Sequence, residues 1–141
     1  FQVDHWSDGG ALIQGAGSIV SSVNDQLTWL EAHLDPPDAV DGGSLGAAFK
    51  EVSIPRRPAG GKKIQIGLGW HFKGESPLMA MHDGGTGGFR SIVAWSADPK
   101  VGIVVLANST DGAIDAIGTR LIMALSQPRE SSDPETAEPL P

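Results

Sequence analysis

The sequence predicts an α+β fold, in which an antiparallel sheet of about four strands in a meander carries helices on one face. Two amphipathic helical patterns lie near the start and the end of the chain, and strand-like patterns separated by turn residues lie between them. The length of 141 residues is typical of one domain. The 19 glycines and 10 prolines favour a fold rich in turns over a plain helical bundle.

The first helical pattern follows a Gly-rich, irregular stretch over residues 1–20. Ser22 is suited to cap this helix, and Asp25 three residues later favours its positive N-terminal end. Pro36 and Pro37 end it. One helical face collects the apolar side chains of Val23, Leu27, Leu30 and Leu34.

The middle of the chain predicts a short helix, a loop and three strands. A weak apolar pattern indicates a short helix over residues 44–52, and the Gly- and Pro-rich stretch 55–63 indicates a loop. Strict alternation of apolar and polar residues over 64–72 predicts one strand with a buried face. A second strand is expected over 78–82 and a third over 89–96.

The C-terminal part predicts a fourth strand and a last helix. Residues 101–107, VGIVVLA, are apolar on both strand faces and are therefore expected to be central or covered by helices. Asp111 is suited to cap the last helix. The tail 127–141 is acidic and Pro-rich, which predicts disorder. The buried face of the last helix is expected to comprise Ile114, Ile117, Leu121 and Leu125.

Composition argues against several classes of function. Ten basic residues against seventeen acidic ones give a net charge of −7, which leaves no basic face to follow nucleic acid. The absence of cysteine excludes disulfides and thiol catalysis. No apolar run reaches the ~18 residues of a membrane span. Because His5, His33 and His71 lack metal-ligand spacing, we expect no metal and no other cofactor.

The Gly-rich run HDGGTGGF, residues 82–89, allows four interpretations, two of which involve nucleotide phosphates. A phosphate-binding loop requires a Lys-Ser/Thr pair and a following helix, whereas here a strand-like pattern follows. A dinucleotide fingerprint fails because Arg90 occupies the place of its third glycine. The remaining interpretations are a structural turn, in which glycines supply positive φ, and one wall of an enzyme active site.

The neighbouring segments favour the active-site interpretation. HDGGTGGF runs into SIVAWSADPKVGIVVLANS and is preceded by GLGWHF and, earlier, by GAGSIVSSVNDQLTWLEAHL. Together these four segments, over residues 15–125, resemble the C-terminal region of the class C beta-lactamase family of serine hydrolases. That family also contains DD-peptidases, D-aminopeptidases and related esterases, so the resemblance does not specify a substrate.

The resemblance assigns His82-Asp83-Gly84 to the family's third active-site motif, at the end of a strand that lines the active site. His82 stands where Lys is common and would orient the substrate or polarise a hydroxyl network; unlike Lys, His changes its charge close to neutral pH. Asp83 stands in the usual place of Thr. Its carboxylate would disfavour an anionic substrate group and favour esters or amides.

The same resemblance implies roles for the residues that follow. Gly85 matches the position whose backbone N–H supplies half of the oxyanion hole, where a missing Cβ lets the substrate approach. Thr86 continues the motif and, with Asp83 and Gly84, is expected to contact the substrate. Asn108 matches a residue near the carboxylate-binding end of the site, although a strand-end cap is an equally good interpretation.

The other two catalytic motifs of the family are absent from the sequence. No serine is followed three positions later by lysine, and the chain has no tyrosine, which excludes Ser-x-x-Lys and Tyr-x-Asn. The resemblance therefore implies that residues 1–126 are the C-terminal portion of a beta-lactamase-like domain whose nucleophile lies outside this chain. The whole enzyme would hydrolyse a small-molecule or peptide carbonyl compound (an ester, amide or beta-lactam) through an acyl-enzyme, and the chain alone would be inactive.

Two alternatives and several partners remain open. The chain is also consistent with a non-catalytic module that binds a peptide or protein through an exposed sheet edge, or with a scaffold that has no site. The expected partners are the missing N-terminal half of the same fold or a second copy. Family resemblance alone suggests a periplasmic or secreted location.

Overall fold

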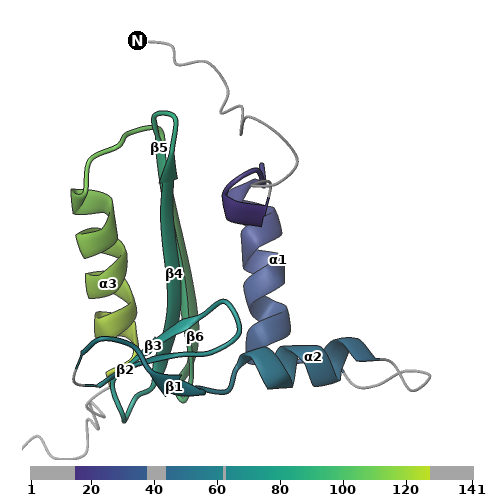
Figure 1. The fold of residues 1–141 in the computed structure, drawn as a ribbon. Coiled ribbons are helices and arrows are strands. Elements are labelled where there is room, and N and C mark those ends of the chain that lie inside the picture. The colour runs from purple at the N-terminus through teal and green to yellow at the C-terminus, as the bar shows by residue number, and fades with distance from the viewer. Residues whose placement is uncertain (1–14, 38–43, 62, 128–141) are drawn as a thin grey trace, which may run out of the picture.

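The computed structural model describes residues 15–37, 44–61 and 63–127. His5 and the predicted tail after Gln127 lie outside the described residues. A six-stranded sheet separates α1 and α2 on one face from α3 on the other (Figure 1). The helices are α1 (Val23–Leu34), α2 (Ser44–Val52) and α3 (Ala113–Leu125). The strands are β1 (Arg57–Pro58), β2 (Ile64–Ile66), β3 (His71–Lys73), β4 (Met79–Thr86), β5 (Phe89–Ala97) and β6 (Lys100–Ala107).

The α+β class and the antiparallel meander are confirmed, with six strands among the described residues, in the order β1 to β6, instead of about four. One added strand, β1, lies in the stretch expected to be a loop, where Arg57 pairs with Ile66. The other arises because the predicted single strand over 64–72 is a hairpin of β2 and β3. The prediction of one continuous strand is therefore wrong.

Two glycines explain that hairpin. Gly69 has φ +81°, a left-handed conformation that a strand excludes and glycine tolerates. A Cβ on Gly67 would lie 2.7 Å from the Phe72 ring and 2.8 Å from the Ile54 carbonyl oxygen, so this position has no room for a side chain. The alternating pattern does not mark one face through the turn, because the register places Phe72 opposite Gln65 and Ile66 opposite His71, and directly opposed residues share a face.

The helices cover both faces of the sheet, in contrast to the single face expected. Alternate residues of the long strands enter two separate cores, because successive strand side chains point to opposite faces. The core beneath α1 comprises Leu30, Trp70, Phe72, Ala80 and Trp95. The core beneath α3 comprises Met81, Ile92, Ala94, Ile103 and Ile122. Strand β6 is helix-covered, as its apolar composition predicted, although it lies at the sheet edge.

Helix α3 presents a different face to the sheet from the one expected. Gly118 and Ile122 are buried against it, whereas Ile117, Leu121 and Leu125 are between 44% and 49% exposed. The reason is steric, because Gly118 lets the helix backbone approach Ile92 closely. A second apolar stripe on α3 is consequently left on the surface of the described residues.

Helix α1 begins as the sequence predicts. The Asp25 backbone N–H donates to the Ser22 side-chain oxygen at 3.2 Å, which satisfies one of the free N–H groups of the first turn. Leu30 is buried, while Val23 and Leu27 of the predicted face are partly exposed. The helix also buries His33, a residue on which the apolar pattern gave no information.

Candidate active site

The predicted third motif lies where β4 extends beyond β3. Strand β3 pairs only with the first three residues of β4, and its last partner is Met81. From His82 to Thr86, β4 pairs with β5 alone. Among the described residues, the outer edge of β4 is therefore open along residues 82–86, which we call the motif segment.

The hydrogen-bond pattern determines which backbone groups of the motif segment face this open edge. In an antiparallel pair, bonded and non-bonded residue pairs alternate. The Gly67 N–H donates to the Trp70 carbonyl at 2.8 Å, so the next pair along β2 and β3 is non-bonded. His71 is thereby turned toward β4, where it pairs with Met81.

The same alternation continues along β4. The backbone N–H and carbonyl groups of Met81 face β3. Asp83 and Gly85 direct theirs to the same side of β4, which is the open edge because β3 does not extend past Met81. The β4–β5 turn leads to the same assignment. Thr86 and Phe89 flank a two-residue turn and form a bonded pair, which leaves Gly85 in a non-bonded pair with β5.

That turn needs its two glycines. Gly87 has φ +40° and Gly88 has φ +100°, so both central residues occupy the left-handed region, as in a type I′ turn. Four glycines in the run thus divide between two tasks: Gly87 and Gly88 make the turn, while Gly84 and Gly85 lie within β4. The interpretation of the run as a structural turn is therefore correct for Gly87 and Gly88, but not for Gly84 and Gly85.

His82 lies exposed at the base of the motif segment, beside a second histidine. The ring centroids of His82 and His71 are 5.7 Å apart, at the point where β3 ends and β4 continues without it. The sequence did not predict that the two histidines are neighbours, because its pattern placed His71 in one long strand. The glycines of the β2–β3 turn were the available signal, since a hairpin there brings His71 next to β4.

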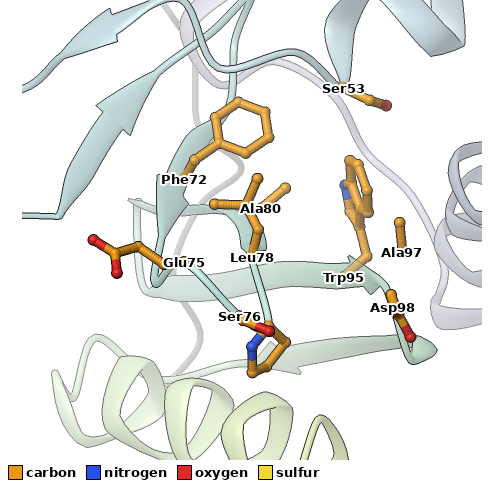
Figure 2. Close-up of a pocket in the computed structure, with 10 residues that line it drawn as sticks. Ser53, Phe72, Glu75, Ser76, Leu78, Ala80, Trp95, Ala97 and Asp98 are labelled. Atoms are coloured by element: carbon orange, nitrogen blue, oxygen red, sulfur yellow. The ribbon is translucent and has the colours of Figure 1, made fainter.

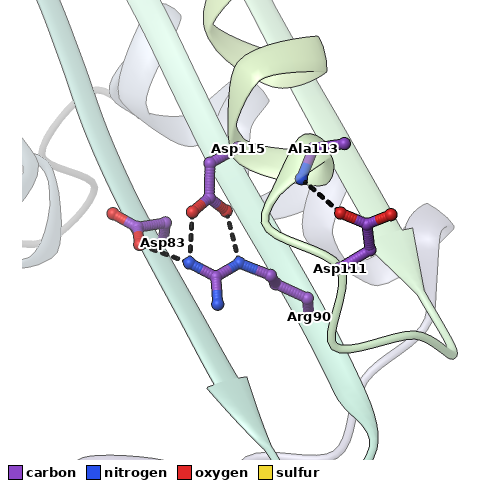
Figure 3. A network of polar contacts seen from close by, with 5 residues as sticks. All are labelled: Asp83, Arg90, Asp111, Ala113 and Asp115. Atoms are coloured by element: carbon purple, nitrogen blue, oxygen red, sulfur yellow. Dashed lines mark hydrogen bonds and ion pairs between the residues drawn. The ribbon is translucent and has the colours of Figure 1, made fainter.

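A charged network on the α3 face of the sheet was also not predicted from the sequence. The Arg90 Nε donates to Asp115 Oδ1 at 2.8 Å, and Arg90 Nη2 donates to the other oxygen of the same carboxylate (Figure 3). Asp83 Oδ2 lies 3.9 Å from Arg90 Nη2. The hydrogen bonds to Asp115 raise the pKa of Arg90, and Arg90 lowers the pKa of Asp115.

The remaining candidate residues lie at the same end of the sheet. Thr86 closes the motif segment, and a Cβ on Gly17 would stand 3.0 Å from its Cγ2, so the chain before α1 reaches the tip of the hairpin. Asn108 directly follows β6 and is exposed. Because β5 separates β6 from β4, Asn108 is on the same end as the motif segment but does not adjoin it.

A cavity of about 270 Å³ lies at the other end of the sheet. Its walls include Phe72, Leu78, Ala80 and Trp95, and none of the motif residues contributes to it (Figure 2). The motif segment is a ledge at a strand edge and has no enclosing walls in the part of the chain described. A substrate bound there would have to be covered from the side of the open edge.

Two other features of the described residues bear on the site. No group of three or more histidine or carboxylate side chains in the described ranges is arranged to hold a metal ion. No helix there is long and apolar enough to cross a bilayer.

Comparison with known proteins identifies the family. A sequence model of the family described as Beta-lactamase matches residues 2–127. The chain is also 30% identical over 118 residues to a protein of Aspergillus violaceofuscus (strain CBS 115571) named Unguisins hydrolase ungD. That alignment covers 70% of this chain and 20% of the relative, so the chain spans about a fifth of the relative's length. The family match extends over most of the sequence, and the chain therefore belongs to the beta-lactamase family.

Proposed function

We propose that this chain supplies one wall of a serine-hydrolase active site and half of its oxyanion hole. The observation that carries the proposal is the open edge of β4, along which Asp83 and Gly85 direct their N–H groups away from β5. Such donors, fixed in a sheet before substrate arrives, stabilise the negative charge that develops on a carbonyl oxygen during acyl transfer.

The residues of the wall have distinct roles in this proposal. The Gly85 N–H is one donor to the oxyanion, and the missing side chain lets the carbonyl approach the strand. His82, exposed at the base of the motif segment, orients the substrate or takes part in proton transfer. Asp83, Gly84 and Thr86 contact the substrate along the edge.

The electrostatics favour an uncharged acyl group. The two carboxylates of Asp83 and Asp115 face a single guanidinium, that of Arg90, which leaves the network with one excess negative charge. Because Arg90 is already hydrogen-bonded to Asp115, it is not free to bind a substrate carboxylate. An ester or amide therefore suits the site better than an anionic substrate, and Asn108, which is uncharged, would not offset the excess negative charge.

The nucleophile is proposed to lie on a polypeptide segment outside this sequence. Support comes from the absence of Ser-x-x-Lys and of tyrosine in the chain, and from the greater length of the relative named as a hydrolase. Activation of a serine requires a base within hydrogen-bond reach, and the motif segment offers no such serine. The segment that carries the nucleophile would also close the site from the open edge.

Complementation tests this function. The purified chain is mixed with a family segment that carries Ser-x-x-Lys and Tyr-x-Asn, and hydrolysis of a chromogenic ester is followed. We expect a burst and steady turnover in the mixture, and neither with the chain alone or with a segment whose nucleophilic Ser is replaced by Ala. Turnover by the chain alone would show that the nucleophile lies within this sequence, and would contradict the proposal.

A second candidate function, a non-catalytic binding module, is favoured by one observation. Ile117, Leu121 and Leu125 form an exposed apolar stripe on α3, and β6 is an apolar edge strand. Both would suit self-association or a protein partner. Stable complex formation in the mixture without any ester hydrolysis would favour this function over the first.

A further inference from the structure

We propose that Arg90 is a positioning residue, which holds the tip of the β4–β5 hairpin against helix α3 and thereby sets the direction of the Gly85 N–H. The inference rests on the proposed function only for what that N–H does. The positioning itself concerns the chain alone and can be tested without any substrate.

The hairpin tip has few other supports. Strand β3 does not pair with β4 beyond Met81. The pairing of β6 with β5 ends at Ala107, which lies opposite Arg90. The final residue pair, Thr86 with Phe89, therefore has no strand on either side among the described residues. The tip is also rich in glycine, which has the largest conformational freedom to lose on ordering.

Arg90 lies where a clamp on Gly85 is needed. It is directly opposite Gly85 in the register of the two strands. A Cβ on Gly85 would stand 3.4 Å from Arg90 Nη1, so the guanidinium lies over the face of Gly85 on the α3 side. The glycine thus leaves space for the arginine side chain as well as for an incoming substrate.

The anchor of the clamp is the first turn of α3. Asp115 accepts from both Nε and Nη2 of Arg90, and the planar guanidinium allows this forked arrangement in one orientation (Figure 3). Asp115 also lies at the N-terminal end of its helix, where a carboxylate is favourably placed. Arg90 and Asp115 are 25 positions apart in the sequence. Their ion pair ties the hairpin to the first turn of α3, in addition to the packing of Gly118 against Ile92 further along the helix.

Lysine cannot replace Arg90 in this role. Its ammonium group is a point charge that makes no forked contact and does not define an orientation. If Arg90 contributed only positive charge, Arg90→Lys would keep its effect. If Arg90 positions the tip, Arg90→Lys and Asp115→Asn should behave alike.

Amide hydrogen exchange of the ¹⁵N-labelled 141-residue chain tests the proposal. The Gly84 and Thr86 amides, which face β5, report on opening of the tip, and the Ala94 amide reports on the core of the sheet. We expect Arg90→Lys and Asp115→Asn to accelerate exchange at Gly84 and Thr86 about tenfold, with exchange at Ala94 unchanged. The control is Arg56→Gln, which removes an exposed ion pair with Glu51 elsewhere in the chain.

Two results would overturn the proposal. One is unchanged exchange at the tip in both variants. The other is an equal acceleration at the tip and at Ala94, because this would assign Arg90 to global stability. In a complemented enzyme, the same variants should lower kcat with little change in KM. Failure of complementation would count against the proposed hydrolase, whereas the exchange data would still decide the role of Arg90.

Discussion

Gly118 of α3 lies so close to Ile92 of β5 that a methyl group on the glycine would stand 2.3 Å from Ile92 Cγ2. Ile92 is only 2% exposed and packs in the core with Met81, Ala94, Ile103 and Ile122. The contact determines how closely α3 packs on the sheet, and therefore where its first turn brings Asp115 to Arg90 of β5.

Gly118→Ala should consequently destabilise the protein. Alanine is the better helix former by about 1 kcal/mol, but overpacking of a core typically costs about 1–3 kcal/mol. We expect a net loss of stability in urea unfolding, and a loss in the double variant with Ile92→Ala that is smaller than the sum of the two single losses. Gly112→Ala is the control, because a Cβ there meets nothing within 4 Å. Equal stability of the two single variants would contradict the packing described.

His33 should make the protein sensitive to mild acid. It is 3% exposed, and burial lowers its pKa, an effect only partly offset by the hydrogen bond from Nδ1 to the Trp29 carbonyl. Below a pH of about 6.5 the unfolded chain binds a proton that the folded chain resists, so stability falls as pH decreases. Urea unfolding between about pH 7 and about pH 5 should show this slope, and His33→Leu should reduce it. His71→Gln, at a less buried position, is the control; a slope that survives His33→Leu would contradict the assignment.

The Arg90–Asp115 ion pair should make stability depend on pH in a lower range than His33 does. Because Arg90 lowers the pKa of Asp115, the stabilisation is complete above the ordinary Asp value of about 3.9 and is lost as pH falls through the lower folded value. The stability difference between wild type and Asp115→Asn should therefore be constant near neutral pH and shrink below about pH 4. A difference that persists unchanged into strong acid would mean that the carboxylate charge is not involved.

Gly85→Pro should separate the proposed catalytic N–H from the fold. The proline removes a group that faces the open edge and forms no bond with β5, so folding should be tolerated. Gly84→Pro removes a bonded N–H and should destabilise the hairpin. In a complemented enzyme Gly85→Pro should lower kcat by about 10²–10³, and Gly85→Ala, which keeps the N–H, by less. Comparable kcat values for the two Gly85 variants would argue against an oxyanion contact.

The sequence predicted the parts of this fold that local physics controls. The cap at Ser22, the extent of α1 and α2 and the strands β5 and β6 depend on neighbouring residues, and the structure agrees with them. Strand β4, expected to end at residue 82, continues through the first two glycines to Thr86. The β2–β3 hairpin was missed because the spacing of the apolar residues matches a single strand, although the register puts Ile64 and Ile66 on the opposite face of the sheet from Phe72. Gly67 and Gly69 carried the signal.

Features that depend on contacts distant in sequence were not predictable in the same way. The buried face of α3 is decided by the fit of Gly118 to Ile92, and periodicity instead selected the more hydrophobic stripe with Leu121. Arg90 and Asp115 are 25 residues apart on elements of different type. The motif residues His82 to Thr86 were found because they are contiguous, whereas their open edge follows from where β3 stops.

Hydrogen exchange along β4 is the most direct test of the central claim, that Gly85 directs its N–H away from the sheet. We expect alternation in the folded chain, with slow exchange at His82, Gly84 and Thr86 and fast exchange at Asp83 and Gly85. Protection of the Gly85 amide equal to that of Gly84 would place it in the ladder with β5 and contradict the proposed wall.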